Sequence, residues 1–287
     1  MTDTSPISFP AQDHACFRVI GLPAFNDNVI WVLHMDGAGA ARSEVVVIDP
    51  GDAAPVIAYC RQYGLTPTQI WLTHHHADHM GGVAELQGWV GGQGGVLNVY
   101  GPAAEAIPGV TQPLHGGETL SLGANVGVSV MAVPGHTRGH LAYFVPGAGK
   151  VTPPALFCGD VLFGLGCGRL FEGTAAQMYA SLGAIAALPA GTQVYCAHEY
   201  TLLNLPFALA VDADNAALQS RAATIRLLRN TGESTLPLTL AEELATNPFL
   251  RCDQPALIAS AVLPDDAQAV DVFAQLRLMR DTFKAPQ

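Results

Sequence analysis

Four histidines and one aspartate fall within six positions of a stretch that reads THHHADHMGG, from residue 73 to residue 82. They are His74, His75, His76, Asp78 and His79. Imidazole nitrogens and carboxylate oxygens at this density are what a divalent metal needs, and a folding core does not need them. Alternation along the loop lets His74 and His76 point one way, while Asp78 and His79 reach a second position nearby. The spacing therefore indicates two metals.

The elements that must hold these ligands are short buried strands. The stretch follows an apolar run, Gln69–Leu72, that is typical of such a strand. Three later apolar runs also end at a possible ligand: 131–135 before His136, 155–159 before Asp160, and 193–197 before His198. Imidazole combined with carboxylate suits zinc, iron or manganese better than calcium or magnesium, which prefer oxygen ligands.

An isolated histidine or aspartate has a simpler explanation than metal binding. A single histidine at a strand end is more often a hydrogen-bonded structural residue, and we assign His14, His34 and His115 to that class. Asp160 by itself would be a turn former. His140 also reads as structural, as a donor that supports the site from behind. Within the cluster, His75 should point away from its neighbours, so packing or solvent contact is its expected role.

Composition excludes several classes of function. The chain has 287 residues, 49% of them hydrophobic and only 13% charged, as expected for one large globular domain with an appendage. Its formal net charge of −11 argues against a general nucleic-acid binder. The sequence contains no run of about 18 apolar residues, so we expect no membrane span. The first residues lack the basic and apolar regions of a secretion signal. We therefore expect a cytoplasmic protein. We take it to be a monomer, although no sequence feature bears on its oligomeric state.

The cysteines agree with that location. They are scattered, without a Cys-x-x-Cys pair: Cys16, Cys60, Cys158, Cys167, Cys196 and Cys252. In a chain of this size they are interpreted as reduced thiols and not as a disulfide framework.

Strand and helix signals alternate up to about residue 200, which predicts a layered α/β domain. The expected strands are 29–33, 44–48, 69–72, 96–100, 126–133, 141–145, 155–158 and 193–196, and the expected helices are 53–63 and 177–188. The glycine-rich segment 89–96 is expected to be a flexible loop. After residue 201 the strand signals stop. Helices are expected over 212–229 and 266–283, with a third opened by a capping box at Thr239–Glu242.

These motifs resemble those of a known family. THHHADH matches the HxHxDH signature of the metallo-β-lactamase superfamily, and His136, Asp160 and His198 follow in that superfamily's order. More narrowly, the chain resembles the glyoxalase II, or hydroxyacylglutathione hydrolase, family. The matching segments are GHTRGH at 135–140, GDVLF at 159–163, GCGRLFEG at 166–173, HEYT at 198–201 and LRLMRD at 276–281. The resemblance implies a four-layer αββα sandwich at residues 1–200 and a helical glutathione-binding domain at 201–287.

The resemblance also implies a ligand set and a mechanism. His74, His76 and His136 would hold one metal, Asp78, His79 and His198 would hold the other, and Asp160 would bridge both. The two divalent ions would be zinc, with iron or manganese as alternatives. A bridging hydroxide would attack the thioester, with Asp78 and Asp160 acting as metal ligands first and Asp78 also orienting the hydroxide. The sequence offers no Gly-x-Ser-x-Gly elbow for a serine nucleophile.

The substrate implied by the family is S-D-lactoylglutathione, which would give D-lactate and glutathione. Arg277 and Arg280, spaced i and i+3 on one helical face, would grip its carboxylates. The remaining implied pocket residues are Cys167, Arg169, Phe171 and Tyr200. The chain departs from the usual family pattern at two of these positions, with Arg280 in place of lysine and Phe171 in place of tyrosine. Arginine keeps the charge, whereas phenylalanine loses a hydroxyl.

Three other functions share parts of this pattern. One is a persulfide dioxygenase of the same fold with a single iron. Another is a lactonase or a β-lactamase, and the last is a metal-binding protein without activity. The helical tail with its two arginines favours the glutathione thioesterase over the first two. The complete set of seven ligands disfavours the third.

Overall fold

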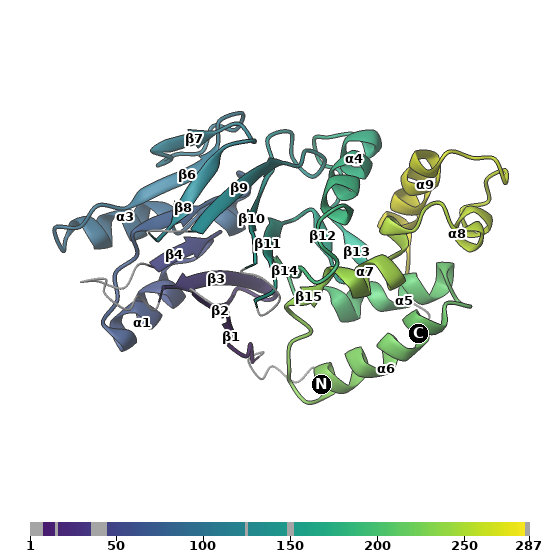
Figure 1. Cartoon of the computed structure of the whole chain (residues 1–287), viewed down its shortest axis with the longest axis horizontal. Coiled ribbons are helices and arrows are strands. Elements are labelled where there is room, and N and C mark those ends of the chain that lie inside the picture. Colours follow the sequence, from purple (N-terminus) through teal and green to yellow (C-terminus); the bar gives the residue numbers. More distant parts are fainter. Residues whose placement is uncertain (1–7, 15–16, 36–44, 124–125, 148–151, 285–287) are drawn as a thin grey trace.

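The computed structural model describes residues 8–14, 17–35, 45–123, 126–147 and 152–284. Two sheets lie at its centre (Figure 1). The first sheet has the strand order β1 to β7: Gln12–Asp13, Arg18–Ala24, Asn28–His34, Val45–Ile48, Gln69–Trp71, Asn98–Pro102 and Gln112–Leu114. The second has the order β15-β14-β11-β10-β9-β8: Leu238–Thr239, Gln193–Cys196, Ala155–Gly159, Leu141–Val145, Val126–Ala132 and Thr119–Leu122. A small hairpin pairs β12, Leu162–Phe163, with β13, Gly166–Cys167.

The helices divide between the two halves of the chain. The part of the chain before residue 199 contains α1 (Ala53–Tyr63), α2 (Ala77–Met80), α3 (Val83–Gly91) and α4 (Ala175–Ala186). The rest is α5 (Thr201–Val211), α6 (Ala216–Asn230), α7 (Leu240–Thr246), the 3-10 turn Pro248–Leu250, α8 (Pro255–Ser260) and α9 (Ala269–Thr282). Within the part of the chain that the structure describes, no helix is long and apolar enough to cross a membrane.

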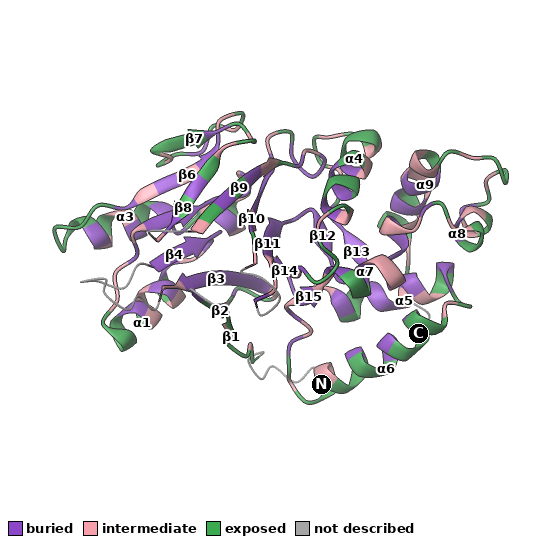
Figure 2. Ribbon diagram, viewed as in Figure 1, coloured by how far each residue is buried: buried purple, intermediate pink, exposed green. Residues whose placement is uncertain are grey.

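The central strands of the first sheet, β3 to β5, are buried on both faces, which explains their continuous apolar runs. In β3, Ile30 and Val32 join a core with helices α1 and α3. Trp31 and Leu33 point the other way and join the core that includes the second sheet. Residues of α4 belong to that same core. Purple buried segments run through both sheets in Figure 2. The layers are therefore helix, sheet, sheet and helix, and the expected fold class is confirmed.

Several elements end where the sequence predicts. Helix 53–63 and strands 141–145 and 193–196 have the expected bounds. The strand expected at 44–48 begins at Val45, and Glu44 lies outside the described residues, as does Cys16.

Other expectations about the elements were wrong. The predicted loop 89–96 begins inside α3, and α5 was not predicted as a helix. Thr239 precedes α7, but its side chain makes no capping hydrogen bond. Glu242 instead forms an ion pair with Arg221. Strand structure also does not stop at residue 201, because Leu238 and Thr239 pair antiparallel with β14.

Candidate metal centre

All seven side chains predicted to bind metal gather beyond the C-terminal ends of four strands, β5, β9, β11 and β14. Three groups have ligand atoms that all lie within 4.8 Å of one another: His74, His76 and His136; His74, His79 and Asp160; and Asp78, His79 and His198. Short loops after rigid strands thus bring together residues up to 124 positions apart, from 74 to 198. The structure holds these groups in one cluster, as the sequence pattern indicates.

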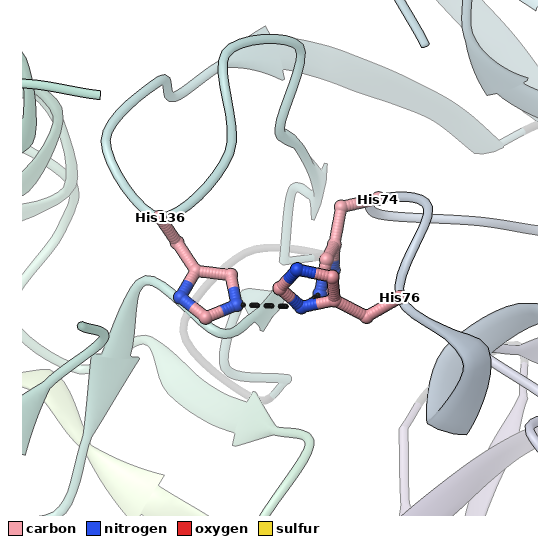
Figure 3. A group of neighbouring side chains, drawn as sticks. All are labelled: His74, His76 and His136. Atoms are coloured by element: carbon pink, nitrogen blue, oxygen red, sulfur yellow. Dashed lines mark hydrogen bonds between the residues drawn. The ribbon is translucent and has the colours of Figure 1, made fainter. Parts of the chain in front are cut away.

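The three-histidine group is compact. His76 Nδ1 lies 3.0 Å from His74 Nε2 and 3.1 Å from His136 Nε2. Figure 3 shows the rings of His76 and His136 turned toward each other from two different loops. Two nitrogens that share a tetrahedral zinc at about 2.05 Å would be about 3.3 Å apart. The observed spacing is close to that value, so this group fits a zinc-sized ion.

Asp160 connects this group to the second one. Its Oδ2 lies 3.3 Å from His136 Nε2, on the side of the three-histidine group. Its Oδ1 lies 3.5 Å from His79 Nε2 and 3.4 Å from His198 Nε2. The two oxygens of one carboxylate therefore face two different ligand groups. Asp78 Oδ2 lies 3.5 Å from His79 Nε2 and 3.6 Å from His198 Nε2, which completes the second group.

Two atoms of this cluster support metal binding directly. His79 Nε2 and Asp160 Oδ1 are buried and have no hydrogen-bond partner. A buried polar atom without a partner is destabilising unless something else satisfies it. Both atoms point into the cluster, where a cation would satisfy them. The donor set therefore fits a pair of divalent ions.

Burial and charge give the two halves of the cluster different electrostatics. Burial lowers the pKa of His74 well below its ordinary value, and it also lowers the pKa of His136. Burial opposes protonation of His198 as well, but Asp160 and Asp27 outweigh it and raise the pKa of His198 to about 10. Burial likewise opposes ionisation of Asp160, yet His79 and His198 hold the pKa of that carboxyl well below its usual range. Asp160 is therefore a carboxylate at any physiological pH.

Three residues that orient the cluster were not predicted from the sequence. Asp49 Oδ2 accepts hydrogen bonds from His79 Nδ1, at 3.0 Å, and from the Thr73 hydroxyl, at 2.7 Å. Asp27 Oδ1 lies 2.8 Å from His198 Nδ1, and Asn28 Nδ2 donates to Asp78 Oδ2 at 3.0 Å. Such partners fix the ring orientation of a metal-binding histidine. A sequence signal for Asp49 is its place directly after β4, in the segment Asp49-Pro-Gly51.

Two glycines are required because the backbone passes close to the cluster. A Cβ at Gly51 would lie 1.9 Å from the Asp78 carbonyl oxygen. A Cβ at Gly168 would lie 1.9 Å from the Asp160 carbonyl oxygen. Any side chain at either position would push a predicted metal ligand away, so the glycines of the DPG and GCGR segments are explained by packing.

The remaining histidines are placed outside the cluster. His75 turns toward Glu105 and Glu172 and belongs to none of the three ligand groups, as expected. His140 stacks on His74 with ring centroids 4.7 Å apart. Its expected role as a donor was wrong at this contact, because its Nε2 accepts a hydrogen bond from the Asp160 backbone N–H. His14 bonds to the Pro153 carbonyl and the Tyr195 hydroxyl, in keeping with a structural role.

A cavity of about 520 Å³ opens beside the cluster. All six residues predicted for the substrate pocket line it: Cys167, Arg169, Phe171, Tyr200, Arg277 and Arg280. Leu203 and Asn204 of α5 also line the cavity and were not predicted. Phe171 stands over the three-histidine group, with its ring centroid 5.2 Å from that of His136. Tyr200 stacks on His198 at 4.7 Å.

The three arginines of the cavity differ in how free their charges are. Arg277 is only 5% exposed, and it donates to the Cys167 carbonyl and to the Asp281 carboxylate. Arg280 donates to Asn204 Oδ1 at 3.1 Å. The side chain of Arg169 is 66% exposed. Burial raises the pKa of the Cys167 thiol even beside Arg277, so Cys167 is not a thiolate nucleophile.

Known proteins were compared with this chain. Residues 199–283 match the family model for the hydroxyacylglutathione hydrolase C-terminus, and residues 40–198 match that for the metallo-beta-lactamase superfamily. The hydroxyacylglutathione hydrolase of Dechloromonas aromatica (strain RCB) is 50% identical over 280 residues, which cover 91% of this chain and 98% of that protein. The chain belongs to the hydroxyacylglutathione hydrolase family. The family member from Xanthomonas oryzae pv. oryzae (strain MAFF 311018) is also 50% identical, over 270 residues, which cover 93% of this chain and 99% of that protein.

Solved structures show the same fold at lower identity. The crystal structure of BLEG-1 B3 metallo-beta-lactamase matches with a TM-score of 0.56 and 25% identity, covering 82% of this chain and 99% of that one. ETHE1 from Myxococcus xanthus matches with a TM-score of 0.61 and 22% identity, covering 94% of this chain and 92% of that one. These structures support the fold, and the two family models and the curated relatives confirm the resemblance inferred from the sequence motifs, both for the superfamily and for the narrower family.

Proposed function

We propose that this protein hydrolyses S-D-lactoylglutathione to D-lactate and glutathione at a centre of two divalent metals. The observation that carries the proposal is one cavity in which a His/Asp cluster lies beside arginines of the C-terminal helices. The first part supplies hydrolytic chemistry and the second supplies recognition of an anionic substrate. The family to which the chain belongs supports the same activity.

Seven residues would hold the metals. We assign His74, His76 and His136 to one ion, Asp78, His79 and His198 to the other, and Asp160 to both. The distances within the three ligand groups and the two unpartnered buried atoms support this assignment. Zinc suits the mixed imidazole and carboxylate set, and iron or manganese would also be accepted.

Bound metals would lower the pKa of a shared water and polarise the thioester carbonyl. The residues of this chain supply the rest. Asn28 holds the Asp78 carboxylate in the orientation that faces His79 and His198. Burial raises the pKa of the Tyr200 hydroxyl, which therefore stays protonated beside Asp27. Hydrolysis breaks the C–S bond and adds water, and the thiolate that leaves needs little help from an acid.

Glutathione carries two carboxylates, and the cavity rim offers cations to them. Arg169 and Arg280 are the more available of the three arginines. Arg169 is largely exposed and lies 3.8 Å from Asp281, whereas Arg277 is buried and donates to Asp281 at 2.9 Å and to the Cys167 carbonyl. Arg277 would then shape the pocket wall while adding positive potential. Phe171 would cover the acyl end of the substrate, because its ring lies against His76 and His136.

We infer that the division of labour follows the chain: residues 1–200 form the catalytic part and residues 201–287 the glutathione-binding part. The adjacent matches of the two family models, at 40–198 and 199–283, support this division. We also propose a cytoplasmic monomer. The described cysteines are buried and unpaired, which supports a reducing compartment, and light scattering of the purified protein would test the monomer.

The test is a hydrolysis assay combined with metal analysis of the same sample. Purified protein should cleave S-D-lactoylglutathione and contain close to two metals per chain. A panel of glutathione thioesters, lactones and β-lactams should show a strong preference for the thioesters. One iron per chain, with oxygen consumed in the presence of glutathione persulfide, would instead identify a dioxygenase. No turnover of any thioester by fully metallated protein would leave only a binding role.

A further inference from the structure

A buried carboxylate outside the metal cluster joins two of the loops that carry its histidines. Glu105 lies in the turn after β6, and its side chain is only 4% exposed. Its Oε2 lies 2.8 Å from His75 Nδ1. Its Oε1 accepts from the Thr137 hydroxyl, at 2.5 Å, and from the Gly139 backbone N–H, at 3.0 Å. All of these contacts are to loops that supply predicted metal ligands.

The partners of Glu105 have positions that matter for the three-histidine group. His75 stands between His74 and His76 in the chain, and Thr137 directly follows His136. One carboxylate therefore fixes the spacing between the loop after β5 and the loop after β9. The approach is close, because a Cβ at Gly139 would lie 2.7 Å from Glu105 Cγ. A buried carboxylate that accepts three hydrogen bonds is held in one orientation.

The network continues to the rim of the substrate cavity. His75 Nε2 lies 3.2 Å from Glu172 Oε1, and Glu172 Oε2 accepts from the Arg138 backbone N–H at 3.2 Å. Glu172 follows Phe171, and the backbone N–H groups of both donate to the His136 carbonyl. His75 thus links the loop of the first metal ligands to the loop that carries Phe171.

We propose that Glu105 is a positioning residue that sets the geometry of the three-histidine metal site, with His75 as its link to the cavity rim. This rests on the proposed two-metal function. The hydrogen bonds of Glu105 go to His75, Thr137 and Gly139 and not to a predicted ligand, so it acts by holding the loops of His76 and His136 at the distance that one ion requires. Loss of a group that hydrogen-bonds a metal ligand typically costs about 10- to 100-fold in metal affinity, and we expect a comparable cost when the loops of two ligands lose the carboxylate that joins them.

The experiment measures metal affinity without substrate. Metal-free Glu105→Ala protein is titrated with zinc against a chelator of known affinity. We expect one of the two zinc ions to bind about 10- to 100-fold more weakly, with the other close to parent affinity. The cobalt-substituted variant should show altered absorption bands for one ion only. At saturating metal, kcat should fall more than KM changes. Glu105→Gln keeps an oxygen for Thr137 and Gly139, so it should recover most of the affinity.

Two further variants keep the test decisive. Glu118→Ala is the control, because Glu118 accepts from the backbone of His115 and Gly116 within a single turn and joins no metal loop. It should bind both ions as the parent does. If Glu105→Ala fails to fold, the double variant His75→Ala, Thr137→Val removes two of the three bonds and should weaken the same ion.

Parent-like affinity for both ions, in Glu105→Ala or in the double variant, would overturn the proposal. So would an equal loss of both ions with a matching drop in the Tm of the metal-free protein, since that pattern indicates a general structural role. A parent protein that binds two metals but cleaves no glutathione thioester would contradict the proposed function and leave the positioning role intact.

Discussion

At the scale of single residues, the central feature is a carboxylate shared between two ligand groups. Asp160 turns one oxygen toward His136 and the other toward His79 and His198. No other predicted ligand faces both groups in this way among the residues that the structure describes. Its loss should therefore affect both metals, whereas loss of a single histidine should affect one.

Asp160→Asn tests this difference while keeping the side-chain volume. We expect the variant to retain fewer metals per chain and to lose more than about 100-fold of its kcat/KM. His136→Asn is the matched comparison and should retain the second metal. The measurement is metal content by elemental analysis alongside thioester hydrolysis. Full metal occupancy in Asp160→Asn would show that the carboxylate does not bridge the two sites.

Two arginines of the cavity should differ in whether they contribute to substrate binding alone or also to the stability of the fold. Arg280→Ala should raise KM about fivefold and leave kcat nearly unchanged, because a partly solvated charge pair contributes roughly 1 kcal/mol. Arg277→Ala should in addition lower the free energy of unfolding by about 1–3 kcal/mol, since it leaves the Cys167 carbonyl without its buried donor, while Asp281 keeps Arg169 as a partner. Chemical denaturation and steady-state kinetics on both variants check this. Equal free energies of unfolding for Arg277→Ala and Arg280→Ala would contradict the structural role that we assign to the buried Arg277.

The role of a residue could be predicted where chemically active side chains are close together in the sequence. It could not be predicted where the residue acts through a partner that is distant in the sequence. The cluster at 74–79 could be predicted as a metal site because a folding core does not need so many imidazoles in one short stretch. Asp27 and Asn28 look like ordinary turn residues, and their meaning comes only from contact with His198 and Asp78. Glu105 is 30 positions from His75, so nothing in the local sequence marks it.

At the scale of elements, the helical tail is joined to the catalytic half by buried polar contacts. Glu243 of α7 is fully buried, and its carboxylate accepts from the Leu165 backbone N–H, Asn247 and Arg221. Leu165 lies in the turn between β12 and β13, and β13 carries Cys167. One helix of the tail therefore holds the hairpin that forms part of the cavity wall.

Two adjacent glutamates of α7 allow a matched comparison. Glu243→Ala should lower the free energy of unfolding by about 3–5 kcal/mol, because it removes the buried carboxylate and leaves the buried Arg221 charge with only the half-exposed Glu242 as an ion-pair partner. Glu242→Ala should change it by about 1 kcal/mol or less, since that pair with Arg221, at 3.6 Å, is half-exposed. Urea denaturation of both variants measures the difference. Similar values for the two would indicate that Arg221 finds another partner.

Element boundaries were predictable where propensity and burial agree. Helix 53–63 begins after Asp52, which caps it by accepting from the Ala54 N–H, and it ends at Gly64 in the left-handed conformation. Helix α5 was missed because Pro206 lies inside it and its apolar residues do not form a single stripe. The capping box expected at Thr239 does not form: the Thr239 side chain makes no capping hydrogen bond, and Glu242 pairs with Arg221.

At the scale of the whole molecule, the two functional parts share one core. The cluster that fills the space between the sheets includes Met178 and Leu182 of α4 together with Phe207, Phe273 and Leu276 of the tail. The tail also supplies β15 to the second sheet. The matches to the two family models meet at residues 198 and 199. The hydrophobic core nevertheless contains residues from both sides of that boundary.

We therefore expect the chain to unfold as one unit. Calorimetry of the metal-free protein should give a single transition, with equal calorimetric and van't Hoff enthalpies. A chain cut to residues 1–200 should not fold stably, because it would expose the α4 side of the core and lose β15. Two separate transitions, or a folded and soluble 1–200 fragment, would show that the parts fold independently.

Protonation of one structural histidine should give the whole molecule a dependence on pH that is separate from its metals. His14 lies between the Pro153 carbonyl and the Tyr195 hydroxyl and stacks on Phe17. Burial lowers its pKa below the ordinary value of 6.5 in the folded state. The unfolded chain therefore takes up a proton first as the pH falls, so the stabilising contribution of neutral His14 is present above about pH 6.5 and lost below it.

The variant His14→Gln isolates this effect. Between about pH 7 and about pH 5, a range that brackets the ordinary histidine pKa, the free energy of unfolding should fall more steeply for the parent than for the variant. Both proteins are compared in the metal-free state, so the other histidines contribute equally and cancel in the difference. Parallel pH profiles for the two proteins would mean that His14 has the same pKa in the folded and unfolded states, and that its contacts with Pro153 and Tyr195 leave it as accessible to protons as it is in water.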